Sequence, residues 1–198
     1  MNTMLSLIVL AAGKSTRMRG RNKLLAQVHG KSMIRKVVET ALNSKADEVI
    51  VVLGWQAEKL RAVLNDFPCH LVMNRDYEQG QSSSVKAGLR AIGNATRAIL
   101  VLPADIAKID TRSINLVIDE YNQTKAPLII AAYKGNLGHP ILLSKELFKE
   151  IEQIGEPTFG LKSLMKKHKS EMRLVETGRE NVLRDVDTPE DLKELLNA

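Results

Sequence analysis

The chain has 198 residues, of which 44% are hydrophobic and 26% are charged, a composition typical of a globular protein long enough for one well-packed α/β domain. Its net charge of +6 favours anionic partners such as nucleotides. Aromatic residues make up only 4%, and no apolar stretch is long enough to cross a bilayer, so the composition argues against single-stranded nucleic acid and membrane insertion.

The lone cysteine, Cys69, rules out an internal disulfide and is typical of a reducing compartment, so we expect a cytoplasmic protein. Residues 5–12 are apolar enough to suggest a signal peptide, but the four residues before them include no basic side chain. The four histidines, His29, His70, His139 and His168, lie too far apart for zinc-ligand spacing.

The first predicted element is a buried strand at residues 5–10, followed by a loop that ends at Lys23. The loop begins with small residues and then includes five cations between Lys14 and Lys23. Backbone N–H groups of such a loop can approach a phosphate chain while the basic side chains reach its oxygens. The loop therefore indicates a site for a nucleoside triphosphate, although the same cations would also suit a solvated surface.

Farther along the chain, helical patterns at residues 32–43, 56–64, 82–92 and 111–123 alternate with apolar runs at 48–53, 69–73, 98–102 and 128–132. This alternation predicts βαβ units and a mainly parallel sheet. A turn at residues 135–138 leads into a strand at 140–143, where the pairing is expected to become antiparallel. Helices at 144–154 and 158–168, a strand at 173–176 and a last helix capped by Thr188, with Pro189 at its first position, complete the prediction. We therefore predict a single Rossmann-like, three-layer α/β domain over residues 1–198.

Ligands of open parallel sheets bind beyond the carboxyl ends of the strands. Three candidate site elements follow predicted strands directly: the loop after Leu10, the segment around Gly80, and Asp105. Because these elements are expected at one edge of one sheet, we predict that they share a site.

The tripeptide Gly13-Lys14-Ser15 also suggests a P-loop, in which Lys14 would bind phosphate. A P-loop needs a glycine five residues before Gly13, where this chain has Ile8. A kinase or phosphohydrolase that uses Lys14 remains an alternative hypothesis.

Four segments in order along residues 5–192 resemble the molybdenum-cofactor nucleotidyltransferase group, and in particular its cytidylyl-transferring branch. They are the loop with Leu10, Ala11, Ala12, Gly13, Ser15, Arg17, Met18 and Lys23; residues 74–89, with Gly80, Ser83 and Ser84; Gly138-His139-Pro140; and residues 185–192, with Asp185 and Asp187. Two positions depart from the group's pattern: Arg19 lengthens the loop by one residue, and Ala104-Asp105-Ile106-Ala107 replaces Gly-Asp-x-Pro.

The resemblance implies a role for each of these residues. Leu10, Ala11, Ala12, Gly13, Ser15, Gly80, Ser83 and Ser84 would contact the nucleotide, Gly138, His139 and Pro140 would shape the acceptor site, and Arg17, Lys23 and Asp105 would be catalytic. Arg17 would clamp the β- and γ-phosphates, and Lys23 would meet the α-phosphate. Asp105 and Asp187 would hold Mg²⁺, with Asp185 as the alternative to Asp187.

Three of these assignments have a structural alternative. Asp187 would instead stabilise the N-terminus of the last helix, and the serines before Val85 would cap a helix. His139 would be a residue of a surface turn.

The implied reaction is Mg²⁺-dependent transfer of a nucleotidyl group from a triphosphate, CTP first and GTP second, to a phosphorylated acceptor with release of pyrophosphate. Molybdopterin is the first candidate acceptor, which would make a molybdoenzyme a partner. Sugar phosphates and other phosphorylated alcohols are alternative acceptors. The altered surroundings of Asp105 motivate a further alternative, a catalytically silent nucleotide-binding chaperone for a metal cofactor.

Overall fold

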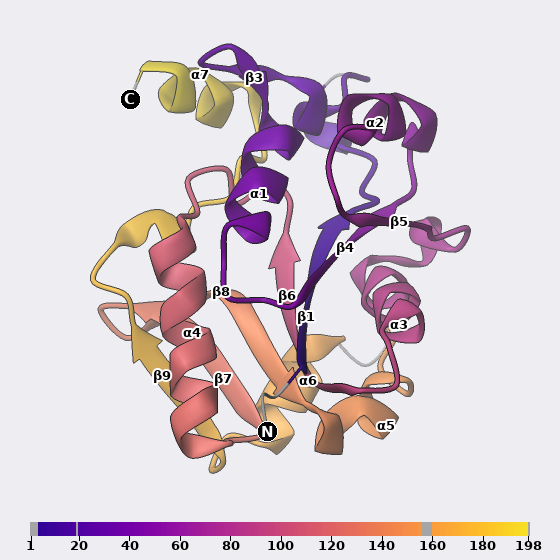
Figure 1. Ribbon diagram of the computed structural model, residues 1–198. Helices are drawn as coiled ribbons and strands as arrows, with labels where there is room; N and C mark the ends of the chain where they lie inside the picture. Colours follow the sequence, from indigo (N-terminus) through magenta and orange to yellow (C-terminus); the bar gives the residue numbers. More distant parts are fainter. Residues whose placement is uncertain (1–3, 19, 156–159, 198) are drawn as a thin grey trace.

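A seven-stranded sheet forms the middle of the molecule, and helices cover both of its faces (Figure 1). The computed structural model describes residues 4–18, 20–155 and 160–197. The strands of the sheet are β1 (Met4–Ala11), β4 (Glu48–Leu53), β5 (His70–Met73), β6 (Thr96–Pro103), β7 (Leu128–Tyr133), β8 (Asn136–Ser144) and β9 (Met172–Glu176). Their order is β5-β4-β1-β6-β8-β7-β9. The predicted Rossmann-like, mainly parallel three-layer fold is confirmed.

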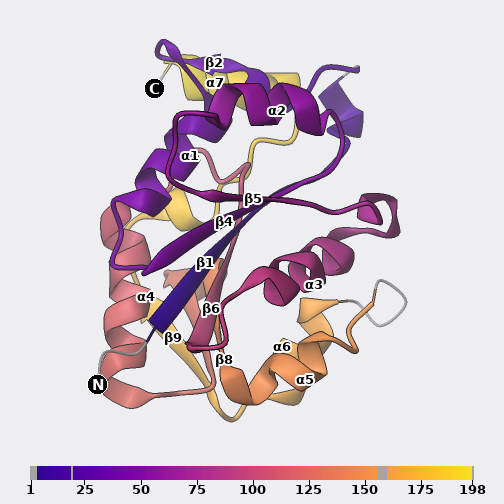
Figure 2. The same ribbon diagram turned by 45° about the vertical axis from the view of Figure 1, so that its right-hand side comes forward.

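The two layers of helices pack on two separate apolar clusters, as Figure 2 shows with the sheet between them. One layer holds α1 (Met33–Leu42), α2 (Ala57–Leu64), α4 (Thr111–Thr124) and α7 (Pro189–Asn197). The other layer holds α3 (Gln81–Ala91), α5 (Phe148–Ile151) and α6 (Leu161–Lys167). Among the described helices, none has the length and apolar character needed to span a bilayer.

The central strands are mainly apolar because both of their faces are covered. In β1, Leu7 and Val9 belong to the cluster under α1 and α4, whereas Ile8 and Leu10 belong to the cluster under α3. Side chains alternate between the faces of a strand, so a strand buried on both sides is apolar on both faces. Ser6 is a buried polar exception in β1, and its hydroxyl forms hydrogen bonds with Glu48 and Thr96.

Strand β8 is antiparallel to both β6 and β7, as expected for this part of the chain. The turn before β8 is tighter than predicted, because Lys134 and Gly135 form it with φ angles of 50° and 76°. Two such angles in succession favour a two-residue hairpin turn. Gly138 therefore lies within β8, where a Cβ would overlap the backbone carbonyl of Val182.

Two other predictions differ from the structure. The helix predicted at residues 144–154 is a short 3₁₀ turn (η4, Lys145–Leu147) followed by α5, which ends at Ile151. Leu147, Ile151 and Ile154 are all buried. Their helical spacing therefore reflects burial in the core, although no continuous helix connects them. The predicted start of the next helix, at residue 158, lies outside the described residues, and α6 begins at Leu161.

Some short elements were not predicted, because they contain no periodic pattern of apolar residues. They are the hairpin of β2 (Gln27–Val28) and β3 (Lys31–Ser32), and the 3₁₀ turns η1 (Thr16–Met18), η2 (Lys23–Leu25), η3 (Tyr77–Gln79) and η6 (Glu180–Val182).

Candidate active site

The carboxyl ends of three neighbouring strands lie at the same level of the sheet. In the parallel pairs, Ala11 of β1 lies opposite Leu53 of β4, and Leu10 lies opposite Pro103 of β6. The arrowheads of β1 and β6 point toward the same end of the molecule in Figure 1. The chain continues from β1 to β4 on one side and returns to β6 on the other, so the loop after β1 lies at the switch point of the sheet.

Local hydrogen bonds shape the loop between Ala11 and Lys23. Ser15 adopts a left-handed conformation with φ of 50°, and its hydroxyl accepts a hydrogen bond of 3.3 Å from the backbone N–H of Lys23. Asn22 caps η2 by accepting from the backbone N–H of Leu24 at 3.1 Å. These contacts place Lys23 at the start of a fixed turn.

Lys23 is the centre of the site. Its Nζ donates to Oδ2 of Asp105 at 2.7 Å and to Oδ1 of Asp187 at 2.8 Å, and its side chain is only 12% exposed. Arg17 pairs with the other carboxylate oxygen of Asp187. Two cations of the loop and two aspartates from distant parts of the chain therefore form one ion-pair cluster.

The segment before α7 brings Asp187 to the site. The backbone N–H of Val186 donates to the carbonyl of Asp105 at 3.0 Å. The cap of α7 is a reciprocal one, because Asp191 accepts from the Thr188 N–H at 2.7 Å while the Thr188 hydroxyl accepts from the Asp191 N–H at 3.1 Å. Asp191 thus supports the helix N-terminus, which leaves the Asp187 carboxylate to face the cations.

The pKa values of these groups reflect their neighbours. Burial acts to lower the pKa of Lys23, but Asp105 and Asp187 more than offset this effect and raise it, so the ammonium stays charged. The hydrogen bond from Lys23, followed by the charges of Lys23 and Arg17, lowers the pKa of Asp187 despite its partial burial. Burial and the charge of Asp187 raise the pKa of Asp185.

A cleft of about 340 Å³ lies beside this cluster. The predicted site residues along it are Leu10, Ala12, Gly13, Ser15, Arg17, Lys23, Gly80, Ser84, Asp105 and Asp187. Apart from its neighbours in the chain, no described residue has an atom within 4 Å of the place where a Cβ on Gly13 would be. The missing side chain therefore leaves open space at the cleft, where a nucleotide can approach the backbone.

Three predicted site residues lie elsewhere. Ala11 is buried in the core beneath α1 and does not line the cleft. Ser83 accepts from Asn74 at 2.9 Å and donates to the Gly80 carbonyl at 2.7 Å, so it supports the loop. Pro140 is buried in β8.

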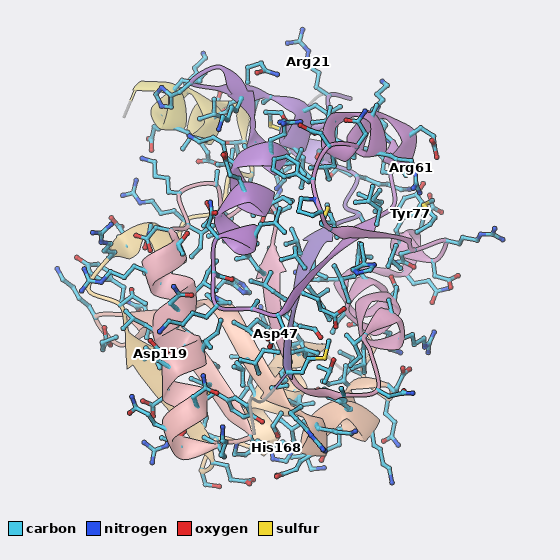
Figure 3. The ribbon with its side chains drawn as sticks, viewed as in Figure 1. Arg21, Asp47, Arg61, Tyr77, Asp119 and His168 are labelled. Carbon is cyan, nitrogen blue, oxygen red and sulfur yellow. The ribbon has the colours of Figure 1, made fainter. Side chains whose placement is uncertain are left out.

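Several cleft residues were not predicted. Tyr77, Gln81, Thr16, Leu24 and Pro103 also line the cleft. Tyr77, labelled in Figure 3, belongs to η3 within the segment at residues 74–89 that carried the family resemblance. Tyr77 follows the carboxyl end of β5, and this position could have identified it as a candidate site residue.

Gly138 and His139 line two further cavities beside the cleft, one of about 290 Å³ that Asp105 also lines and a larger one of about 750 Å³. Burial lowers the pKa of His139, against the opposing effects of Asp105 and of a hydrogen bond to the Val101 backbone, so the imidazole is neutral at neutral pH. Its Nδ1 is buried and has no hydrogen-bond partner in the described part of the chain.

The two aspartates suit a hard divalent cation. Their carboxylates converge on one ammonium within 2.8 Å, so both can reach a single ion, and carboxylate oxygens are the ligands that Mg²⁺ uses together with phosphate and water. No group of three or more His, Cys, Asp or Glu suited to a metal occurs among the described residues. A cation here would therefore need oxygens from a bound ligand or from water.

The family model described as "MobA-like NTP transferase domain" matches residues 7–172. The chain belongs to this family. The matched range includes Arg17, Lys23 and Asp105 but ends before Asp187.

Two curated relatives illustrate the range of proteins similar to this chain. The nicotine blue oxidoreductase of Paenarthrobacter nicotinovorans is 26% identical over 196 residues, which cover 96% of this chain and 95% of that protein. The bifunctional protein GlmU of Prochlorococcus marinus is 29% identical over 124 residues, or 62% of this chain. The chain spans only about a quarter of that protein, since the match covers 27% of it.

Solved structures share the MobA-like fold over nearly the whole chain. Rv0371c of Mycobacterium tuberculosis superposes with a TM-score of 0.88 at 24% identity and covers 100% of both chains. A manganese complex of the same protein gives a TM-score of 0.82 at 23% identity, covering 99% of this chain and 100% of that one. The molybdopterin-guanine dinucleotide biosynthesis protein A of Archaeoglobus fulgidus gives 0.71 at 16% identity, covering 97% of both.

Proposed function

We propose that this MobA-like chain transfers a nucleotidyl group from a nucleoside triphosphate, CTP first and GTP second, to a phosphorylated acceptor and releases pyrophosphate. The observation that carries the proposal is the position of Lys23, whose buried ammonium bridges Asp105 and Asp187 beside an open, glycine-bearing loop. The cations would stabilise the negative charge that develops on the phosphates when a triphosphate is attacked, and the carboxylates would hold a metal ion that has the same effect.

The loop cations would bind the triphosphate. Arg17 presents a planar guanidinium that suits paired β- and γ-phosphate oxygens, and its 65% exposed side chain lies at the outer end of the cluster. Lys23 lies deeper and would neutralise charge at the α-phosphate. The acceptor phosphate oxygen attacks the α-phosphorus, the P–O bond to the β-phosphate breaks, and pyrophosphate leaves. An anionic acceptor oxygen needs no strong general base, so alignment and charge neutralisation account for catalysis.

Asp105 and Asp187 would hold Mg²⁺, and their oxygen donors fit it. A bound Mg²⁺ would neutralise phosphate charge and orient the phosphate oxygens. Both carboxylates are engaged by Lys23 in this structure, so we expect Lys23 and Arg17 to exchange aspartate for phosphate when the nucleotide binds. The manganese complex of Rv0371c supports a divalent cation in proteins of this fold.

Molybdopterin is the proposed acceptor, and a cytoplasmic molybdoenzyme the proposed recipient of the product. The Gly138-His139-Pro140 motif and the similar fold of the molybdopterin-guanine dinucleotide biosynthesis protein A support this choice. Gly138 and His139 lie beside Asp105 along one cavity, where an acceptor phosphate would lie near the metal site.

A thermal-shift screen of CTP, GTP, ATP and UTP with Mg²⁺ tests the donor. We expect CTP to stabilise the protein most, and EDTA to abolish the effect. Stabilisation by none of the four nucleotides would refute the proposal. Pyrophosphate release with phosphorylated acceptors, sugar phosphates included, then tests the reaction and would exclude a silent chaperone.

Two lysine variants separate this proposal from the P-loop hypothesis. Lys14 also lines the cleft, but its exposed ammonium pairs with Glu78 rather than with the aspartates. Lys23→Ala should abolish pyrophosphate release while Lys14→Ala retains most of it. The opposite result would favour a P-loop enzyme.

A redox reaction is a second candidate, because the nicotine blue oxidoreductase matches this chain over nearly its whole length. A nicotinamide dinucleotide also contains a pyrophosphate that the loop cations would suit. Oxidation of NADH or NADPH, followed at 340 nm with a quinonoid dye as acceptor, tests this candidate. Turnover of the dye without pyrophosphate release would favour it over nucleotidyl transfer.

A further inference from the structure

A large cavity between α3, β8 and α6 has no assigned role. It measures about 750 Å³, a size typical of sites for small organic ligands. Its apolar side chains are Val85, Val101, Leu137, Ile141, Leu161, Met165 and Met172. Leu137 is 45% exposed, which is a high exposure for a leucine inside a strand. The cavity therefore offers an apolar wall that the described residues leave uncovered.

The charged side chains of this cavity are all positive. Lys162, Lys166 and Lys169 line it, and no Asp or Glu does among residues 4–18, 20–155 and 160–197. Lys162 and Lys166 are four residues apart and therefore share one side of α6, and Lys169 lies in the turn that follows the helix. None of them has a hydrogen bond or ion pair with a described residue, whereas Lys167 on the same helix pairs with Glu150 at 2.9 Å. Three unpaired cations beside an apolar wall suit an anionic ligand with an apolar body.

The cavity adjoins the proposed active site. Gln81 lines the nucleotide cleft, the small cavity beside Asp105 and the large cavity. Leu137, Gly138 and His139 line both the small cavity and the large one. A ligand could therefore place one phosphate near Asp105 while its body extends toward α6.

His139 provides an independent sign of a missing ligand group. Its ring lies where the small and the large cavity meet, and its buried Nδ1 has no partner among the described residues. A buried polar atom without a hydrogen bond costs free energy, and native structures contain few of them. A donor group of a bound ligand, or a water held by that ligand, would satisfy this nitrogen.

We infer that the large cavity binds the body of the acceptor, and that its apolar wall and its three lysines select acceptors whose extended body has flat apolar faces and an anionic group in addition to the phosphate that attacks the nucleotide. This inference rests on the proposed function. A compact sugar phosphate fits the cavity poorly, because the polar groups of its lining, apart from the lysines, come from Gln81, Ser82 and His139. Sugars need hydrogen-bonding partners for each hydroxyl group.

A fluorescence titration with 8-anilinonaphthalene-1-sulfonate tests the site, because this probe combines an aromatic body with one anionic group. The test variant is Lys162→Ala/Lys166→Ala/Lys169→Ala. The control variant, Lys145→Ala/Lys149→Ala/Lys167→Ala, removes the same charge from η4, α5 and α6, and none of its lysines lines the cavity. We expect the test variant to bind the probe about tenfold more weakly, equivalent to about 1.4 kcal/mol, and the control within about twofold of the wild type. Equal weakening in both variants, or in neither, would overturn the inference.

Competition distinguishes the acceptor classes. We expect 1-naphthyl phosphate to displace the probe at a concentration at least about tenfold lower than glucose 1-phosphate does. Equal displacement by the two phosphates would refute the selection for an apolar body.

Calorimetry with CTP and Mg²⁺ separates this inference from the proposed function. The test variant should keep the wild-type affinity for CTP, because its three lysines lie outside the nucleotide cleft. Wild-type protein that binds no triphosphate would refute the proposed function, whatever the probe shows. Normal CTP binding with an unaltered probe titration would refute only the acceptor site.

Discussion

Replacing Lys23 with alanine should have two opposite effects, one on stability and one on metal affinity. The substitution removes two charge-assisted hydrogen bonds, of 2.7 and 2.8 Å, and leaves two carboxylates close together. Each bond of this kind contributes about 1.5–3 kcal/mol when well buried. The side chains of Asp105 and Asp187 are 24% and 34% exposed, so solvent screening and the relief of lysine desolvation reduce the sum. We expect the free energy of unfolding to fall by about 2 kcal/mol, which lowers Tm by about 4–8 °C for a chain of this size.

The same substitution should tighten Mg²⁺ binding in the absence of nucleotide. In the wild type, a divalent cation must compete with the Lys23 ammonium for both aspartates. Without Lys23, the carboxylates keep only Arg17 as a counter-charge. We expect the affinity for Mg²⁺ to rise about tenfold, as a change of about 1.4 kcal/mol would give. Added Mg²⁺ should also restore part of the lost Tm.

Thermal unfolding and calorimetric titration with MgCl₂ measure the two effects. Lys45→Ala is the control, because Lys45 forms a pair with Asp119 (labelled in Figure 3) in which the side chains are 56% and 40% exposed. Exposed pairs of this kind contribute little, so its Tm should stay within about 1 °C of the wild type. An unchanged Tm and an unchanged Mg²⁺ affinity in Lys23→Ala would refute the view that Lys23 occupies the metal site.

Three further outcomes follow from the structure. Gly13→Val should keep the wild-type Tm, because no described residue other than its chain neighbours lies within 4 Å of the new Cβ. The variant should weaken CTP binding at least about tenfold in calorimetry, and unaltered CTP affinity would show that the nucleotide does not approach this residue. Gly88→Ala should lower the free energy of unfolding in urea by about 1–3 kcal/mol, since its Cβ would overlap Ile8, and a gain in stability would contradict this packing. Hydrogen bonds to Glu171 and Glu150 raise the pKa of His168, so its contribution is complete below the unfolded pKa of about 6.5 and is lost as the pH rises through the folded value. His168→Gln should therefore be more destabilised, relative to wild type, at pH 6 than at pH 9, and an equal difference at both pH values would count against the charged pairing.

Most strands could be predicted because each is an apolar run buried on both faces. The run at residues 48–53 matches β4 residue for residue, and the run at residues 5–10 is extended by one residue at each end in β1. A short apolar run between two predicted helices is typical of a central strand of a parallel sheet. The 3₁₀ geometry of η4 and the end of α5 at Ile151 could not be predicted, because Leu147, Ile151 and Ile154 have helical spacing and are all buried. Periodicity reports which residues face the core, and it does not require an unbroken helix.

The convergence of the loop with Asp105 was predicted from strand ends alone, and Lys23 does contact Asp105. The extra residue at position 19 does not prevent this contact. Whether Asp187 would face the site or support a helix could not be decided from the sequence, because that choice depends on Asp191 taking the capping role. The large cavity was also missed, since its wall combines side chains from α3, β8 and α6 that have no common sequence pattern.

The dependence of the ion-pair cluster on Asp187 has a genetic consequence. Asp187 follows the matched family range by 15 positions, and a boundary at residue 172 would also cut into β9, which begins at Met172. A stop codon or frameshift between codons 172 and 187 would spare the phosphate loop and Asp105 but remove the second acidic partner of Lys23. Truncation alleles in this last stretch should therefore behave as loss of function even when the shortened polypeptide accumulates in the cell.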